Sequence, residues 1–431
     1  MDQKQKKKHP VKGRKFGAAG YLLLLFVMMA GLCGCGRTPA DSSEKPAEAA
    51  EQAAVQAAGQ PVLPDIPGLA VSKTITPEYA EGFTLVGYDD GYTGIRVTDG
   101  PFYLVVPEDS AVPEKLPEDT VVLKKPLNRV YMAASSVMAL YRALDAVDEV
   151  DFSATMADSW YVEEAKEAML SGDILFAGKY SSPDYEMLVS RGCSLAVEST
   201  MVCHHPEVKE KLESLGIPVF VDQSSYEKNP LGRAEWIKVY GVLTGKEAEA
   251  ETFFDRQVQL VQEMQDSEGG ESAEDSKTAG DDTAFGREGR TSAFFYINSS
   301  GQAVVRTGDD YIAEMIRMAG GEYALSDLRN PNPDSRSGSL TLSMEEFYAG
   351  AKDADYLIYN TNIDSSVSSL SDILAKNSLL GEFRAVKKGQ VYLTDRYFYQ
   401  ATDILAEMIV DLHRMFAGEK GENMTFLRHL E

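Results

Sequence analysis

The sequence predicts an α/β protein of two lobes, each with a central, mostly parallel sheet flanked by helices, and one long helix that joins them. Predicted strands and helices alternate twice along the chain, over residues 129–222 and again over 292–416. Several of these strands are almost wholly apolar, which is typical of parallel strands covered by helices on both faces. Between the two regions, residues 247–265 carry apolar side chains at near-helical spacing, which indicates a single long helix.

The expected elements follow from periodicity and turn residues. Residues 83–107 contain short β-rich runs separated by Asp-Asp-Gly and Asp-Gly-Pro, which predict a hairpin or meander before the first lobe. We predict strands at 129–133, 173–177, 194–199, 218–222, 292–297, 355–360 and 390–394. We predict helices at 135–147, 162–170, 185–190, 206–215, 232–243, 247–265, 311–318, 344–351 and 401–416.

The N-terminus carries an export signal over residues 1–34. A basic stretch precedes the apolar run 21–32, which is too short to span a bilayer comfortably. The run ends in Leu-Cys-Gly-Cys, which resembles the bacterial lipobox with Cys35 at the modified position and the small Gly34 before it. The resemblance implies a diacylated Cys35 that anchors the protein to the outer face of the bacterial cytoplasmic membrane. A plain transmembrane anchor is the alternative.

Two tracts of low complexity divide the rest of the chain. Residues 35–68 lack aromatic side chains and predict a flexible tether, and residues 266–290 predict a disordered acidic insertion. The N-terminal lobe with its β-rich extension is then expected at 69–245, the inter-lobe helix at 246–265 and the C-terminal lobe at 291–431.

Charge and cysteine usage exclude several classes of function. The net charge is −25, which argues against nucleic acid and anionic surfaces as partners. Cys193 and Cys203 bracket the predicted strand 194–199, so their separation would exceed the roughly 7 Å that a disulfide allows. We expect two free thiols and no metal site, because His204 and His205 lie on a loop without a further ligand cluster.

Several motifs occur in the order typical of one family. Residues 182–197 and the Gly-Ile-Pro-Val turn at 216–219 match its first lobe, although residues 192–194 depart from the usual Lys-Pro-Asp. Residues 310–322, 343–347, 355–359 and 380–392 match its second lobe. Over residues 125–417 the sequence resembles the helix-linked, periplasmic-type solute-binding proteins of ABC importers for siderophores, haem and cobalamin. The resemblance implies a monomeric receptor that needs no cofactor and delivers a metal chelate or tetrapyrrole to a permease and its ATPase.

Two glutamates take a role from this resemblance. Glu186 and Glu345 match the family's glutamates, one per lobe, that dock into basic pockets of the permease. Solvated carboxylates in the first turn of a helix are the alternative reading, since acidic residues are favoured there.

The ligand is expected between the lobes, where the loops after the strands meet. These loops are rich in Tyr, Arg, Asn and Ser; tyrosine offers an apolar face with a polar tip, and arginine makes bidentate contacts to carboxylates. The candidate ligand-binding residues are Tyr180, Tyr226, Arg233, Arg306, Tyr397 and Tyr399. An iron complex is the first ligand class and a corrinoid the second.

Three rival functions are weaker. The five histidines of the chain show no spacing typical of a Ser-His-Asp triad or a metalloenzyme, so we expect no catalytic residues. The same small supply of histidines disfavours a receptor for zinc or manganese ions. A lipoprotein that has lost its transporter stays possible from the sequence, although the two glutamates speak against it.

Overall fold

The computed structural model describes residues 64–271, 290–333, 335–421 and 423–430. The predicted signal, Cys35, most of the predicted tether and nearly all of the acidic insertion lie outside the described residues. From Pro61 onward the chain forms one compact unit. No helix in the described part combines the length and the apolar character needed to cross a bilayer.

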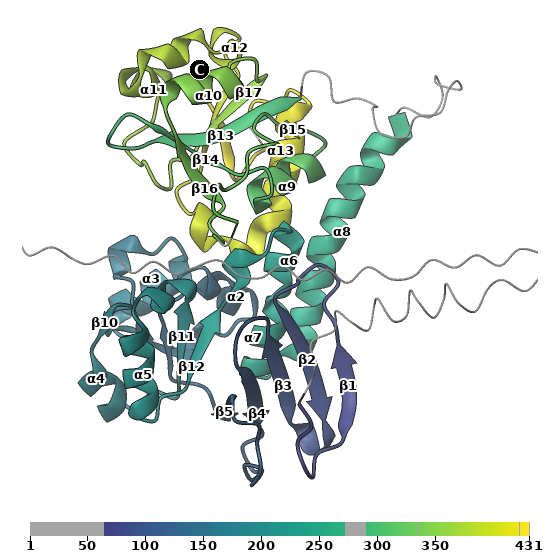
Figure 1. Cartoon of the computed structure of the whole chain (residues 1–431), viewed down its shortest axis with the longest axis vertical. Helices are drawn as coiled ribbons and strands as arrows, with labels where there is room; N and C mark the ends of the chain where they lie inside the picture. The colour runs from purple at the N-terminus through teal and green to yellow at the C-terminus, as the bar shows by residue number, and fades with distance from the viewer. Residues whose placement is uncertain (1–63, 272–289, 334, 422, 431) are drawn as a thin grey trace, which may run out of the picture. The chain divides into compact units, whose positions relative to one another are not determined.

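A five-stranded sheet opens the described chain, and we call it the N-terminal sheet (Figure 1). The first four strands pair antiparallel in sequence order, which confirms the predicted meander, and the fifth pairs parallel with the fourth. The strands are β1 (Val71–Ile75), β2 (Phe83–Tyr88), β3 (Thr93–Val97), β4 (Phe102–Val106) and β5 (Thr120–Lys124). Ile66 is buried against one face of this sheet, so the predicted tether boundary at residue 68 is wrong: the chain is already packed before it.

The first lobe contains a fully parallel sheet of order β12-β11-β6-β7-β8. Its strands are β6 (Val130–Met132), β7 (Val150–Ser153), β8 (Leu175–Phe176), β11 (Leu195–Ser199) and β12 (Val219–Asp222), with a small hairpin of β9 (Gly178–Lys179) and β10 (Ser182–Pro183). The helices are α2 (Val137–Ala143), α3 (Glu163–Ser171), α4 (Tyr185–Ser190), α5 (Pro206–Ser214), α6 (Pro230–Glu235) and α7 (Ile237–Thr244). In β6, β11 and β12, successive apolar residues belong to different core clusters, so both faces of this part of the sheet are buried, as predicted.

One long helix, α8 (Glu247–Glu271), connects the two lobes (Figure 1). Gly245, at φ +74°, ends α7 in a left-handed conformation and permits the corner before α8. The helix packs against α7 and against the last helix of the second lobe. It continues six residues beyond the predicted end at 265, into the segment assigned to the insertion.

The second lobe is built on a mixed sheet of order β16-β14-β13-β17-β18-β19, with β15 also paired to β13. Its strands are β13 (Thr291–Ile297), β14 (Ala303–Arg306), β15 (Glu322–Tyr323), β16 (Ser339–Leu342), β17 (Tyr356–Tyr359), β18 (Val391–Thr394) and β19 (Leu427–His429). The centre is parallel, whereas β14, β16 and β19 add antiparallel edges. The helices are α9 (Tyr311–Met318), α10 (Met344–Ala351), α11 (Leu370–Lys376), α12 (Arg384–Lys387) and α13 (Leu405–Phe416).

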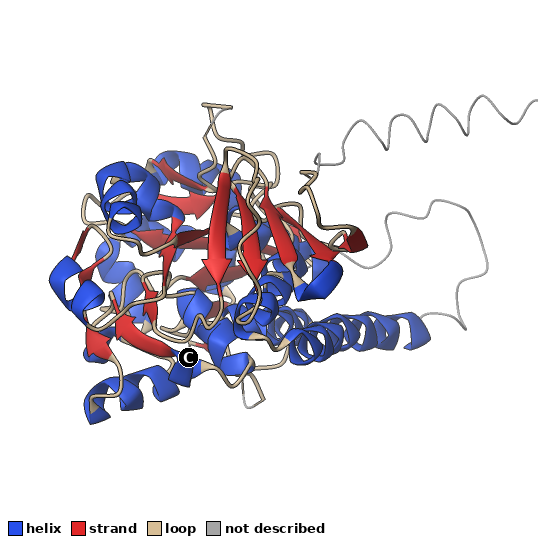
Figure 2. Cartoon of the chain, turned by 90° about the horizontal axis from the view of Figure 1, so that it is seen from below, coloured by secondary structure: helices blue, strands red, loops and turns tan. Residues whose placement is uncertain are grey.

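The predicted fold class is therefore confirmed, with two α/β lobes whose strands lie between helices (Figure 2). Cys193 is buried, Cys203 is exposed, and neither forms a disulfide, as the sequence predicted.

Candidate functional site between the lobes

The two lobes contact each other beside the long helix. Arg142 of α2 forms an ion pair and hydrogen bonds with Asp403, just before α13. Gln400 lies nearby: its amide nitrogen donates to the Ser159 carbonyl at 2.9 Å, and its carbonyl accepts from the Tyr161 N–H at 2.9 Å. These contacts hold the loop after β7 of the first lobe against the loop after β18 of the second.

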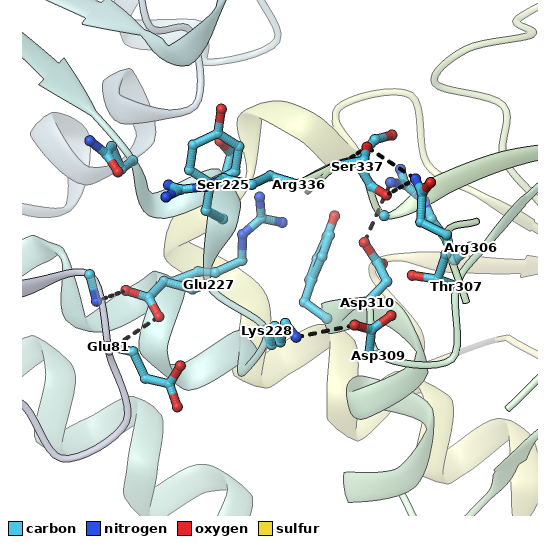
Figure 3. A pocket seen from close by; sticks show the side chains of 18 of the residues that line it. Glu81, Ser225, Glu227, Lys228, Arg306, Thr307, Asp309, Asp310, Arg336 and Ser337 are labelled. Carbon is cyan, nitrogen blue, oxygen red and sulfur yellow. Dashed lines mark hydrogen bonds and ion pairs between the residues drawn. The ribbon is translucent and has the colours of Figure 1, made fainter. Parts of the chain in front are cut away.

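A cavity of about 770 Å³ lies between the lobes, within the usual size range of small-molecule sites. The first lobe contributes residues 223–228 after β12, together with Arg233 of α6. The second lobe contributes residues within 306–311, from the end of β14 to the start of α9, and residues within 329–333 and 335–338 (Figure 3). The N-terminal sheet supplies a third group of lining residues, which are Glu81, Gly82 and Thr98.

Three cationic side chains make contacts from one side of this cavity to the other. Lys228 and Asp309 form an ion pair at 3.1 Å (Figure 3). The Arg233 guanidinium lies 3.7 Å from the ring centre of Tyr311, a cation–π contact between the lobes. Arg336 pairs with Asp99 of the N-terminal sheet, and its guanidinium lies 4.9 Å from the ring centre of Tyr226.

Arg306 is the most buried of the cavity's cations. It donates to the Tyr399 hydroxyl and lies 3.7 Å from the carboxylate of Asp310, which caps α9 by accepting the Ile312 N–H. Burial alone would lower the pKa of Arg306, but Tyr399 and Asp310 reverse this and raise it. Burial raises the pKa of Asp310, against the influence of Arg306. The guanidinium is thus a permanent, preorganised charge at the wall of the cavity.

Five cationic side chains line the cavity, namely Lys228, Arg233, Arg306, Arg329 and Arg336. Four acidic side chains lie among them, namely Glu81, Glu227, Asp309 and Asp310, so the lining has a slight excess of positive charge in a chain whose net charge is −25. Arginine forks suit carboxylate, phosphate and other anionic oxygens. Within the described residues, no group of three or more His, Cys, Asp or Glu is placed to hold a metal ion. The arginines therefore offer contacts to anionic oxygens of a ligand.

A comparison with protein families matches residues 141–397, more than half of the chain, to the model of the periplasmic binding protein family. The chain belongs to this family. The matched family is one of binding proteins. The N-terminal sheet lies outside the matched residues.

Similar proteins agree with this membership. An uncharacterised lipoprotein of Methanocaldococcus jannaschii is 26% identical over 377 residues, which cover 80% of this chain and 83% of that protein. A periplasmic haem-binding protein of Vibrio cholerae has a TM-score of 0.50 at 16% identity and covers 65% of this chain and 96% of its own. Another, from Pseudomonas aeruginosa, has a TM-score of 0.50 at 17% identity, with coverages of 70% and 98%. The two structures share the fold of this binding protein.

Four of the six residues predicted to bind ligand line the cavity of this family member, namely Tyr226, Arg233, Arg306 and Tyr399. Tyr180 does not line the cavity. It follows β8, which lies at the opposite edge of the sheet from β12. The centre of its ring lies 5.9 Å from that of His205. Tyr397 does not line the cavity either. Its hydroxyl donates to the Thr425 carbonyl at 3.1 Å, and burial raises its pKa to about 12.

The sequence prediction missed the loop 329–338 and the residues of the N-terminal sheet. The loop reads Arg-Asn-Pro-Asn-Pro-Asp-Ser-Arg-Ser-Gly, and its length and polarity between a helix and a strand were a usable signal. Nothing local marked Glu81 or Thr98, because only the packing of the N-terminal sheet against α6 brings them to the cavity.

Glu186 and Glu345 occupy equivalent positions in the two lobes. Each is exposed and is the second residue of its helix, α4 and α10 respectively (Figure 1). Their exposure leaves both carboxylates accessible to a partner.

Proposed function

We propose that this protein is a lipid-anchored receptor that captures an iron complex, either a siderophore or haem, between its lobes and delivers it to the permease of an ABC importer. The observation that carries the proposal is the cavity between the lobes, to which both lobes contribute arginines and which keeps a slight excess of positive charge over its four carboxylates in a strongly acidic protein. Ferric siderophores and haem both present anionic oxygens to a binding protein. The haem-binding proteins that share the fold support this ligand class.

The anchor and the docking residues complete the proposal. Cys35 would carry the lipid at the outer face of the cytoplasmic membrane, and the relatives named as lipoproteins support this assignment. Glu186 and Glu345 would contact the two permease subunits, which their exposure on separate lobes supports.

A thermal-shift screen tests the ligand class. The full-length chain in detergent is melted with haemin, a ferric tricatecholate, a ferric trihydroxamate, cyanocobalamin and zinc. A ligand that binds only the folded state stabilises it by about 2.7 kcal/mol at roughly a hundredfold excess over Kd. A clear shift with an iron complex supports the proposal. A shift with cyanocobalamin alone would assign a corrinoid instead, and a shift with zinc alone would contradict the ligand class.

Arg233→Gln tests whether this cavity is the site. The variant removes one charge-assisted contact. It should therefore weaken binding of the ligand that raised the melting temperature about tenfold, a change of ~1.4 kcal/mol. Arg317→Gln is the matched control, because Arg317 is an exposed arginine of α9 outside the cavity. Isothermal titration of both variants makes the comparison; equal affinities would place the ligand elsewhere.

A further inference from the structure

Two buried glutamates bind five consecutive backbone N–H groups of the segment 78–82, which connects β1 to β2 of the N-terminal sheet. Glu235 accepts from the three N–H groups of residues 78–80 at 2.9, 2.8 and 3.0 Å. Glu227 accepts from those of residues 81 and 82 at 3.0 and 2.8 Å (Figure 3). Glu227 precedes α6 and Glu235 is its last residue, so the segment lies along the helix that carries Arg233.

The segment 78–82 and α6 pack so closely that two glycines at their contact, Gly82 and Gly232, leave no room for a Cβ atom. A Cβ on Gly82 would lie 2.7 Å from the Glu227 Oε1 and 2.8 Å from a ring carbon of Trp236. In the opposite direction, a Cβ on Gly232 of α6 would lie 2.7 Å from the Tyr79 carbonyl oxygen. The Trp236 indole N–H also donates to Glu227 at 2.8 Å. The close packing of the segment 78–82 against α6 therefore fixes the position of the turn at residues 81–82.

The two carboxylates differ in what they position. Glu227 lines the cavity, as do Glu81 and Gly82, whose N–H groups it binds. Thr98 also lines the cavity and is tied to the same turn, since its N–H donates to the Gly82 carbonyl at 2.8 Å and its hydroxyl to the Glu81 carbonyl at 2.9 Å. Glu235, in contrast, lies outside the cavity.

Asp99, the residue after Thr98, connects the N-terminal sheet to the second lobe. Asp99 pairs with Arg336, which lines the cavity from the loop 329–338. The sheet therefore contacts the cavity from the side of the first lobe and also holds a cation of the second lobe.

We infer that the N-terminal sheet is part of the ligand-binding apparatus, and that Glu227 is the positioning residue that holds its turns at 81–82 and 98–99 against the bound ligand. The inference rests on the proposed function and extends it to a segment outside the family's matched residues. It makes the sheet a determinant of which ligand the cavity accepts.

The test compares Glu227→Gln with Glu235→Gln in the full-length chain. Each variant weakens a buried carboxylate that accepts hydrogen bonds from the segment 78–82, so both should lower the melting temperature. Affinities are measured by quenching of tryptophan fluorescence with haemin, the ferric tricatecholate, the ferric trihydroxamate and cyanocobalamin, against a detergent blank. Glu227→Gln should weaken binding about tenfold and change the preference between probes, whereas Glu235→Gln should keep the affinity within about twofold.

The outcomes separate the inference from the proposed function. If an iron complex binds and the two variants change affinity equally, or not at all, the sheet acts only through stability and the inference is overturned. If no probe quenches the unmodified protein, the proposed ligand class fails and the inference falls with it.

Asp99→Asn decides the question where Glu227→Gln does not fold. Asp99 is exposed, so its substitution leaves the core intact. Release of Arg336 should speed ligand dissociation several-fold in stopped-flow measurements. Asp109→Asn, an exposed change between β4 and β5 of the same sheet, is the control. Equal dissociation rates for the two variants would overturn the inference.

Discussion

Glu198 shows how a single side chain can make stability depend on pH. It lies near the end of β11 on the same face as Ala196, in the packed layer between the sheet and helices α4 and α5. The side chain is fully buried, and neither carboxylate oxygen has a hydrogen-bond partner. Burial raises its pKa to about 8. The group is therefore neutral in the folded protein at neutral pH, next to Tyr131 and Tyr185, which are neutral as well.

Glu198→Gln should remove a loss of stability that develops as the pH rises from 4.5 to about 8. The unfolded carboxyl group ionises above its ordinary pKa of 4.5, whereas the folded one keeps its proton up to about pH 8. Between these values the folded state binds more protons, so stability falls as pH rises. Relative to the original chain, the variant should gain roughly 1.4 kcal/mol per pH unit across this window.

Urea unfolding at pH 5 and pH 8 measures this difference. Glu210→Gln, an exposed change in α5 of the same lobe, is the control and should show no such gain. A constant difference between Glu198→Gln and the original chain at both pH values would contradict a buried, neutral carboxyl group.

At the scale of elements, local chemistry determined which segments the sequence could predict. Helices α4, α9 and α10 have the predicted bounds, because Asp184, Asp310 and Ser343 cap them and an apolar stripe follows. The strands β7, β14, β16 and β19 were missed. They are short, and β16 and β19 lie at the edges of their sheet: β16, for example, has no fully buried residue and so lacks the apolar pattern that marks a strand.

The site was only partly predictable for a related reason. Tyr226 and Tyr399 were found because they follow predicted strands, and loops at the carboxyl ends of parallel strands meet at one edge. Arg306 is instead the last residue of β14, a strand that the sequence did not predict. Which of those loops share a cavity depends on how the lobes contact each other. The sequence does not report that contact, so Tyr180 was wrongly predicted to line the cavity. The contribution of Glu81 depends on the pairing of a segment with glutamates about 150 residues away, and no local pattern reports that.

The corner between α7 and α8 should be sensitive to one methyl group. A Cβ on Gly241 would lie 2.7 Å from the Cβ of Ala250 and 3.0 Å from the Lys246 carbonyl oxygen. Backbone cannot move aside cheaply, so Gly241→Ala should destabilise the protein by about 1–3 kcal/mol despite the helix propensity of alanine. Gly350→Ala in α10 is the matched control, because its Cβ would meet only the tip of the Leu325 side chain.

Denaturant midpoints of the two glycine variants give the readout. Gly350→Ala should be close to neutral, since a gain of about 1 kcal/mol in helix propensity offsets the movement of Leu325. Equal midpoints would mean that α7 and α8 can separate without cost, and that the corner does not fix the start of the inter-lobe helix.

At the scale of the whole molecule, the proposed capture and delivery would use different surfaces. The cavity lies between the lobes, whereas Glu186 and Glu345 are exposed at the starts of α4 and α10. Neither glutamate lines the cavity, so a receptor that uses them for docking should separate the two activities cleanly. A lipoprotein that only stores or senses its ligand would not need them.

The double variant Glu186→Gln with Glu345→Gln should bind ligand as the original chain does and fail to support uptake. Removal of two charges from docking contacts should lower the uptake rate of an iron complex by about tenfold or more in cells that depend on this receptor. Glu210→Gln with Glu322→Gln is the control, since it removes the same charge from exposed positions of the same two lobes. Binding is measured by titration and uptake with iron-labelled ligand. Normal uptake by the docking variant would assign delivery to another surface, whereas loss of uptake in both variants would indicate a general effect of charge.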